Sequence, residues 1–231
     1  MLVYIMFLLP GILFMLWAQN KVRSNYQKFS QVRNSAGMTG AQAARRILDS
    51  NGLYDVEIER VPGELSDHYD PRARVLRLSE PVYSVPSIAA IGIAAHEAGH
   101  AIQHAKAYVP LQVRTAIVPA VNIGSNLGYI VLIAGLLMAE ANIAWIGVAL
   151  FSLATIFALL TLPVEFDATR RAKLALVQAG IVDGGVAGGS ESQGVARVLD
   201  AAAWTYIAGF ASSLLTLLYY IMMVAGMRRS D

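Results

Sequence analysis

One five-residue pattern has the residue types and the spacing of a metal-dependent hydrolase. Residues His96-Glu97-Ala98-Gly99-His100 form an H-E-x-x-H pattern. Residues four apart on a helix share one face and are about 6 Å apart along its axis, so both imidazoles can reach one metal ion. Glu97 can then act on an attacking water as a general base without binding the metal itself. The pattern predicts one zinc ion per chain and hydrolysis of an amide bond.

A catalytic zinc ion has three protein ligands and one open position, so a third ligand must come from elsewhere. His104 lies four residues beyond His100, but on a straight helix it would be about 12 Å from His96, so we expect it only to support the site. Glu165 is the stronger candidate because it follows a long apolar segment. An apolar hairpin across a membrane would return Glu165 to the side of the two histidines. The alternative for Glu165 is a carboxylate that only stabilises a helix N-terminus.

Hydrolysis also needs a positive or hydrogen-bonding group beside the developing oxyanion. Four residues are candidates for this group, and a purely structural role is the alternative for each of them. We expect His68 to be the strongest candidate. The candidates are His68, Tyr69, Arg170 and Arg171.

The composition indicates a membrane protein. Of the 231 residues, 56% are hydrophobic and only 15% are charged, whereas about 25% are charged in a typical soluble domain. The chain has no cysteine, which excludes disulfides and thiolate metal sites, and its net charge of +2 is too small to suggest a nucleic-acid partner. We predict a mainly α membrane protein, because four nearly uncharged segments are long enough to span a bilayer or close to it. These segments are residues 2–18, 116–138, 143–162 and 204–226.

The basic residues predict an orientation. Of 18 Lys and Arg, 12 lie between Lys21 and Arg114 and four more between Arg170 and Arg197, so both polar parts are expected in the cytoplasm and both termini outside. Arg228 and Arg229 disagree with this orientation. We expect the first segment to be an uncleaved anchor, since no Lys or Arg precedes it and no clear cleavage site follows it. The predicted parts are an anchor (1–18), a cytoplasmic part with the H-E-x-x-H helix (19–115), a transmembrane hairpin (116–162), a second cytoplasmic part with the third ligand (163–203), and a last transmembrane helix with its tail (204–231).

Local signals predict the elements that position the motif. Thr39 has the side chain of an N-cap, and alternation of apolar and polar residues is typical of half-buried strands. Pro163 is expected to start a helix. We predict a polar loop over 66–71 and a glycine-rich mobile loop over 183–190. The predicted helices are 40–49, 87–107 and 164–179, the predicted strands are 56–61 and 74–78, and a connector lies between Pro81 and Pro86.

The chain resembles the YugP-type family of bacterial membrane-associated neutral zinc metallopeptidases. The resemblance covers nearly the whole chain and is carried by residues 67–71, 76–79, 94–104 and 162–172. It implies a small α+β, zincin-like catalytic core at the membrane surface, with short strands before the H-E-x-x-H helix. More distant relatives complete a His-His-Glu site with a glutamate from a later helix, as gluzincins do. An aspartate commonly follows that glutamate by four residues; here the position holds Thr169, and Asp167 lies nearby. Either residue could orient a histidine.

The resemblance also implies a substrate-binding strand. In zincins a strand beside the active helix pairs with extended substrate, and residues 74–78 could offer that edge through the main chain of Val75, Leu76 and Arg77. The expected partners are protein or peptide substrates, the lipid bilayer of the bacterial inner membrane and other membrane proteins, with no nucleic acid.

Two other functions compete with a membrane-anchored endopeptidase. A non-catalytic, zinc-stabilised membrane adaptor would have no use for the base Glu97. An intramembrane protease of the site-2 type would place the motif helix in lipid, but the apolar run around residues 88–95 is shorter than a span and no Asn-Pro-Asp-Gly motif follows.

Overall fold

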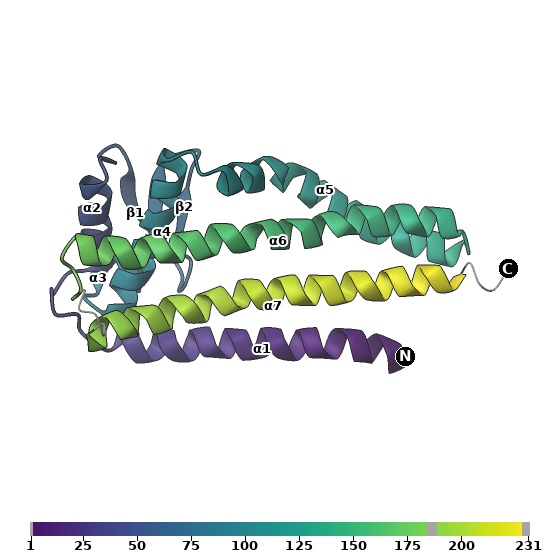
Figure 1. Ribbon diagram of the computed structural model, residues 1–231, viewed down its shortest axis with the longest axis horizontal. Coiled ribbons are helices and arrows are strands. Elements are labelled where there is room, and N and C mark those ends of the chain that lie inside the picture. The colour runs from purple at the N-terminus through teal and green to yellow at the C-terminus, as the bar shows by residue number, and fades with distance from the viewer. Residues whose placement is uncertain (1, 184–188, 228–231) are drawn as a thin grey trace. The chain divides into compact units, whose positions relative to one another are not determined.

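The computed structural model describes residues 2–183 and 189–227 (Figure 1). It is mostly helical, which confirms the predicted mainly α class. The central part of the predicted mobile loop, residues 184–188, lies outside the described residues. The elements are α1 (Leu2–Ser30), α2 (Gly40–Ser50), β1 (Glu57–Val61), β2 (His68–Asp70), β3 (Val75–Ser79), α3 (Glu80–Ser84), α4 (Ile88–Ala105), α5 (Val109–Leu137), α6 (Ala141–Gln178) and α7 (Ser190–Met227).

The chain forms two compact units. The first, here called the apolar unit, comprises Met1–Ala18, Gln112–Pro163 and Thr205–Asp231. The second, called the sheet unit, comprises Gln19–Leu111 and Val164–Trp204. Each unit is described by itself below.

The apolar unit consists of helices packed through small residues. A Cβ atom added to Gly147 on α6 would lie 2.3 Å from the main-chain nitrogen of Leu132 on α5, so the two backbones are in direct contact there. The Ser212 hydroxyl on α7 donates a hydrogen bond of 2.9 Å to the Gly11 carbonyl oxygen on α1. Small residues at such contacts are typical of helices that pack in membranes.

Four helices of the described chain, α1, α5, α6 and α7, are long and apolar enough to cross a membrane. Each contains one of the four predicted apolar segments, apart from residue 138, which follows the end of α5. Large side chains such as Leu13, Ile130 and Leu159 are about half exposed on them, as a lipid-facing surface requires.

Helix α6 does not begin at Pro163, and that expectation is wrong. Pro163 lies inside α6, which has 38 residues and continues from the apolar unit into the sheet unit. A proline removes one main-chain hydrogen bond and favours a kink, but it need not end a helix that is packed on both sides of it. Helix α7 is likewise continuous over 38 residues. A helix of this length measures about 57 Å, well beyond the roughly 30 Å of a bilayer core.

The sheet has the order β1-β3-β2, with β1 parallel and β2 antiparallel to β3. The predicted strands 56–61 and 74–78 correspond to β1 and β3. The predicted loop over 66–71 is wrong in part, because residues 68–70 form β2. The connector between the two prolines is also partly wrong, since most of it belongs to the short helix α3.

The expectation of a free edge at Val75, Leu76 and Arg77 is wrong. These residues lie on the central strand, and each pairs with β1 on one side and with β2 on the other. Their main-chain groups are therefore already used by the sheet. The edge strands are β1 and β2.

The motif helix α4 is held by its start and by its small residues. Ser87 caps it by accepting a hydrogen bond of 3.1 Å from the main-chain nitrogen of Ala90. Thr39 and Gln42 form a complete capping box at the start of α2, which confirms the predicted N-cap. Buried alanines along α4 form the middle of the hydrophobic core together with residues of α2, β3 and the last turns of α6.

Candidate metal centre

The candidate site forms where α4 and the sheet-unit part of α6 come closest. A Cβ atom added to Gly99 would lie 2.7 Å from the Ala168 carbonyl oxygen, so only glycine allows this approach. Gly99 lies inside the H-E-x-x-H motif, and Ala168 is three residues beyond Glu165. The close contact therefore brings the motif and Glu165 together from two helices.

Three predicted side chains meet at this crossing. The Nε2 atoms of His96 and His100 lie 3.2 and 3.5 Å from Oε2 of Glu165. One ligand atom from each of the three residues lies within 4.8 Å of the others. Two ligand atoms bound to one tetrahedral zinc ion are about 3.3 Å apart, given bond lengths of roughly 2.05 Å. The donor types and the separations thus fit a metal ion held between the three side chains.

The site is nearly closed to solvent and attracts positive charge. The exposed fraction is 12% for the side chain of each histidine and 3% for that of Glu165. Burial alone lowers the pKa of His100, but its hydrogen bond to Glu165 and the charges of Glu97 and Glu165 outweigh burial and raise that pKa. Groups that favour a proton on His100 also favour a divalent cation in its place.

Glu97 is buried beside the cluster, with 9% of its surface exposed. Within residues 2–183 and 189–227, no protein group donates a hydrogen bond to its carboxylate. The carboxylate is therefore available for a water molecule or a substrate group.

Each histidine of the cluster has a second polar neighbour at Nδ1. The Thr169 hydroxyl lies 3.4 Å from Nδ1 of His96. The side-chain oxygen of Gln103 lies 3.0 Å from Nδ1 of His100. Thr169 was predicted as a candidate for this role, whereas Gln103 was not; its only signal in the sequence is an amide one helical turn after His100 in an apolar helix.

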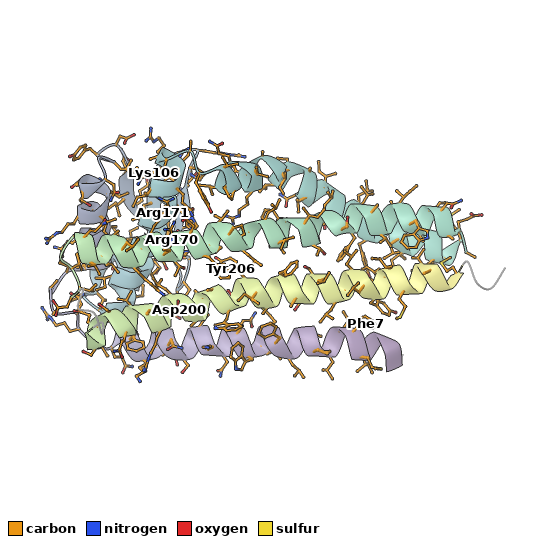
Figure 2. All side chains as sticks on the ribbon, viewed as in Figure 1. Phe7, Lys106, Arg170, Arg171, Asp200 and Tyr206 are labelled. Atoms are coloured by element: carbon orange, nitrogen blue, oxygen red, sulfur yellow. The ribbon has the colours of Figure 1, made fainter. Side chains whose placement is uncertain are left out.

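Asp167, the other predicted candidate, does not contact a histidine directly. It accepts a hydrogen bond of 3.0 Å from the Gln103 amide and forms ion pairs with Arg170 and Arg171. Figure 2 shows both arginines on the ribbon of α6. Both guanidinium groups pair with Asp167, and a role of either arginine as an oxyanion donor stays a prediction.

The remaining histidines lie outside the three-residue cluster in the part of the chain that the structure describes. The His104 ring nitrogen Nδ1 lies 2.9 Å from the Tyr69 hydroxyl, which joins α4 to β2. His68 is exposed on β2, with Nδ1 2.9 Å from the Ser66 carbonyl oxygen.

Comparisons with known proteins agree with the chemistry of this cluster. Residues 4–225 match a family model described as "Putative neutral zinc metallopeptidase". The chain is 50% identical over 206 residues to "Putative membrane protease YugP" of Bacillus subtilis (strain 168), and the match covers 89% of each chain. No solved structure matches the chain.

Proposed function

The chain belongs to the family described as "Putative neutral zinc metallopeptidase", and from this premise we propose that it is a membrane-anchored, zinc-dependent endopeptidase. The observation that carries the proposal is the convergence of His96, His100 and Glu165 within 4.8 Å. These three residues would hold one zinc ion per chain. A bound zinc ion would activate a water molecule and polarise the scissile carbonyl group.

Glu97 is the proposed general base. It follows His96 on the motif helix, is nearly buried, and accepts no hydrogen bond from a described protein group. It would take the proton from the attacking water and deliver it to the leaving amine. The low exposure of the site strengthens the electrostatic effect of each charged group on the reaction.

The substrate would bind along β2 instead of β3. The side of β2 that faces away from β3 has no strand partner among the described residues, so its main chain can pair with an extended peptide. The Tyr69–His104 contact ties this strand to the helix that carries the motif. This arrangement supports a zincin-like core. His68, exposed on β2, is the proposed donor to the oxyanion.

The proposed location is the bacterial inner membrane, with the site on the cytoplasmic side. Four candidate spanning helices and the excess of Lys and Arg in residues 19–115 and 163–203 support this orientation. Because the chain has no cysteine, single cysteines placed at exposed Leu65 and at Glu140 can be labelled with a membrane-impermeant maleimide. Labelling of residue 140 alone in intact cells is the expected result, and labelling of residue 65 alone would refute the orientation.

The decisive experiment replaces Glu97 by glutamine. We expect the purified E97Q protein to keep its zinc and to lose hydrolysis of an unfolded protein substrate by at least 100-fold, because the base is lost while all three ligands remain. Glu57, exposed on β1, offers a matched control, and E57Q should cleave as the wild type does. Cleavage by E97Q at the wild-type rate would contradict the proposal, and a wild type that binds zinc without cleaving would favour the adaptor.

A further inference from the structure

We propose that Gln103 is a positioning residue of the metal centre, which fixes the tautomer and the orientation of the His100 ring and connects that ring to Asp167 on α6. The proposal rests on the proposed function, in which His100 binds zinc. Gln103 has no exposed surface, and an amide buried without partners costs free energy. Each polar atom of this amide has a partner, and the types of these partners determine which atom is the oxygen and which is the nitrogen.

The contacts of Gln103 distinguish the NH₂ group of its amide from the oxygen. One end lies 2.8 Å from the Val164 carbonyl oxygen and 3.0 Å from a carboxylate oxygen of Asp167. Both of these neighbours can only accept hydrogen bonds, since the Asp167 carboxylate is paired with two arginines. The end that faces them must therefore be the NH₂ group, and each of its two hydrogens has an acceptor.

The orientation of the amide then determines the tautomer of His100. The oxygen of Gln103 is the atom 3.0 Å from Nδ1 of His100, and an amide oxygen can only accept. Nδ1 must therefore carry the hydrogen. In the neutral ring this leaves the lone pair on Nε2, which faces Glu165 at 3.5 Å and is the atom a metal ion needs.

The chain of contacts also links the two helices that supply the ligands. His100 and Gln103 lie on α4, whereas Val164 and Asp167 flank Glu165 on α6. Gln103 thus holds the ring of one ligand and the backbone next to another. The direct partner of His100 is the neutral amide of Gln103, and the charge of Asp167 at the far end is paired with Arg170 and Arg171.

Two substitutions separate the positioning of His100 from simple helix bridging. Gln103→Met keeps the size of the side chain but removes both the acceptor and the donors. Gln103→Glu keeps an oxygen that can accept from Nδ1 but loses both bonds to α6, because its second oxygen faces the acceptors of Val164 and Asp167. We expect Q103M to bind zinc 10- to 100-fold more weakly than the wild type in competition with a chelator, and Q103E to keep the Nδ1 hydrogen bond while unfolding at a lower temperature than the wild type. Exposed Gln31 offers a control, and Q31M should bind zinc as the wild type does.

A spectroscopic measurement gives a second readout. The chain has only four histidines, so ¹⁵N-histidine labelling yields a simple spectrum in which His100→Ala identifies the His100 signals. In the zinc-loaded wild type and in Q103E, the Nδ1–H proton of His100 should exchange slowly with water, and in Q103M it should exchange rapidly. Equal zinc affinity in Q103M and the wild type, or rapid exchange of the Nδ1–H proton in Q103E, would overturn the proposal. Neither measurement uses a substrate, so failure of the peptidase proposal appears only in the E97Q cleavage assay.

Discussion

Replacing Gly99 by alanine should weaken metal binding, although neither residue type can bind a metal. The added methyl group would lie 2.7 Å from the Ala168 carbonyl oxygen, whereas ordinary contact begins at 3.4 Å. The helices must therefore separate by about 0.7 Å, or the backbone must distort, to relieve the overlap. If the separation is passed on to the ligands, the spacing of 3.2 Å between His96 and Glu165 would approach 4 Å, against about 3.3 Å for a tetrahedral zinc site.

The expected loss in zinc affinity is about 10- to 100-fold, with a loss of about 1–3 kcal/mol in the stability of the metal-free protein from overpacking. Both quantities can be measured in detergent, by competition with a chelator and by thermal unfolding at one scan rate. Gly92 on the same helix offers a matched control, because the three atoms nearest to its added Cβ all belong to Val195, at 3.5 Å or more. G92A should bind zinc normally and gain about 0.5–1 kcal/mol from the better helix propensity of alanine.

A G99A protein that binds zinc as tightly as the wild type would refute this reasoning, since the site would then not depend on the close approach of the two helices. Equal weakening in G92A and G99A would refute it as well. That result would show that any added methyl group on α4 disturbs the site.

Three further predictions address the ligand set, the capping of α2 and the turn between β2 and β3. Glu165→Ala should lose stoichiometric zinc in metal analysis, because two imidazoles alone leave the ion without its third ligand; retention of one zinc per chain would contradict the assignment. Thr39→Ala should lower stability by about 1 kcal/mol in thermal unfolding by removing the capping box, and an unchanged midpoint would count against that role. Hydrogen bonds from Arg77 and from the turn that follows lower the pKa of Asp70. The ionised Asp70 carboxylate therefore stabilises the fold above the ordinary aspartate pKa of about 3.9, and this stabilisation is lost as the pH falls through the lowered pKa. The difference in melting temperature between the wild type and Asp70→Asn should therefore disappear in acid. A difference that stays constant with pH would contradict this prediction.

The residues that the sequence predicts best are those whose signal is local. The H-E-x-x-H spacing places two imidazoles on one helical face, and Thr39 with Gln42 marks the start of α2. Glu165 could be predicted because two apolar segments separate it from the histidines. A hairpin of these two segments across a membrane returns the chain to the same side, and this gives the long-range proximity that no local pattern contains.

The elements that were missed depend on contacts between distant residues. Strand β2 has three residues, too few to show alternation, and exists because it pairs with β3. The central position of β3 follows from that pairing and from the parallel pairing with β1, neither of which local residues reveal. Gln103 could not be recognised because its partners, Val164 and Asp167, are more than 60 residues away in the chain. Pro163 was predicted to start a helix because proline favours that position locally. The tertiary packing that keeps α6 continuous across Pro163 leaves no local signal.

The placement of Glu165 on α6 has a consequence for how the protein is made. The ribosome completes α4, with both histidines and Glu97, before it begins the α5–α6 hairpin, and Glu165 is synthesised only after most of that hairpin. A nascent or truncated chain that ends within the hairpin before Glu165 carries the motif but lacks the third residue of the cluster. Assembly of the His96–His100–Glu165 cluster therefore comes after synthesis of the α5–α6 hairpin, so incomplete chains cannot form the candidate metal centre.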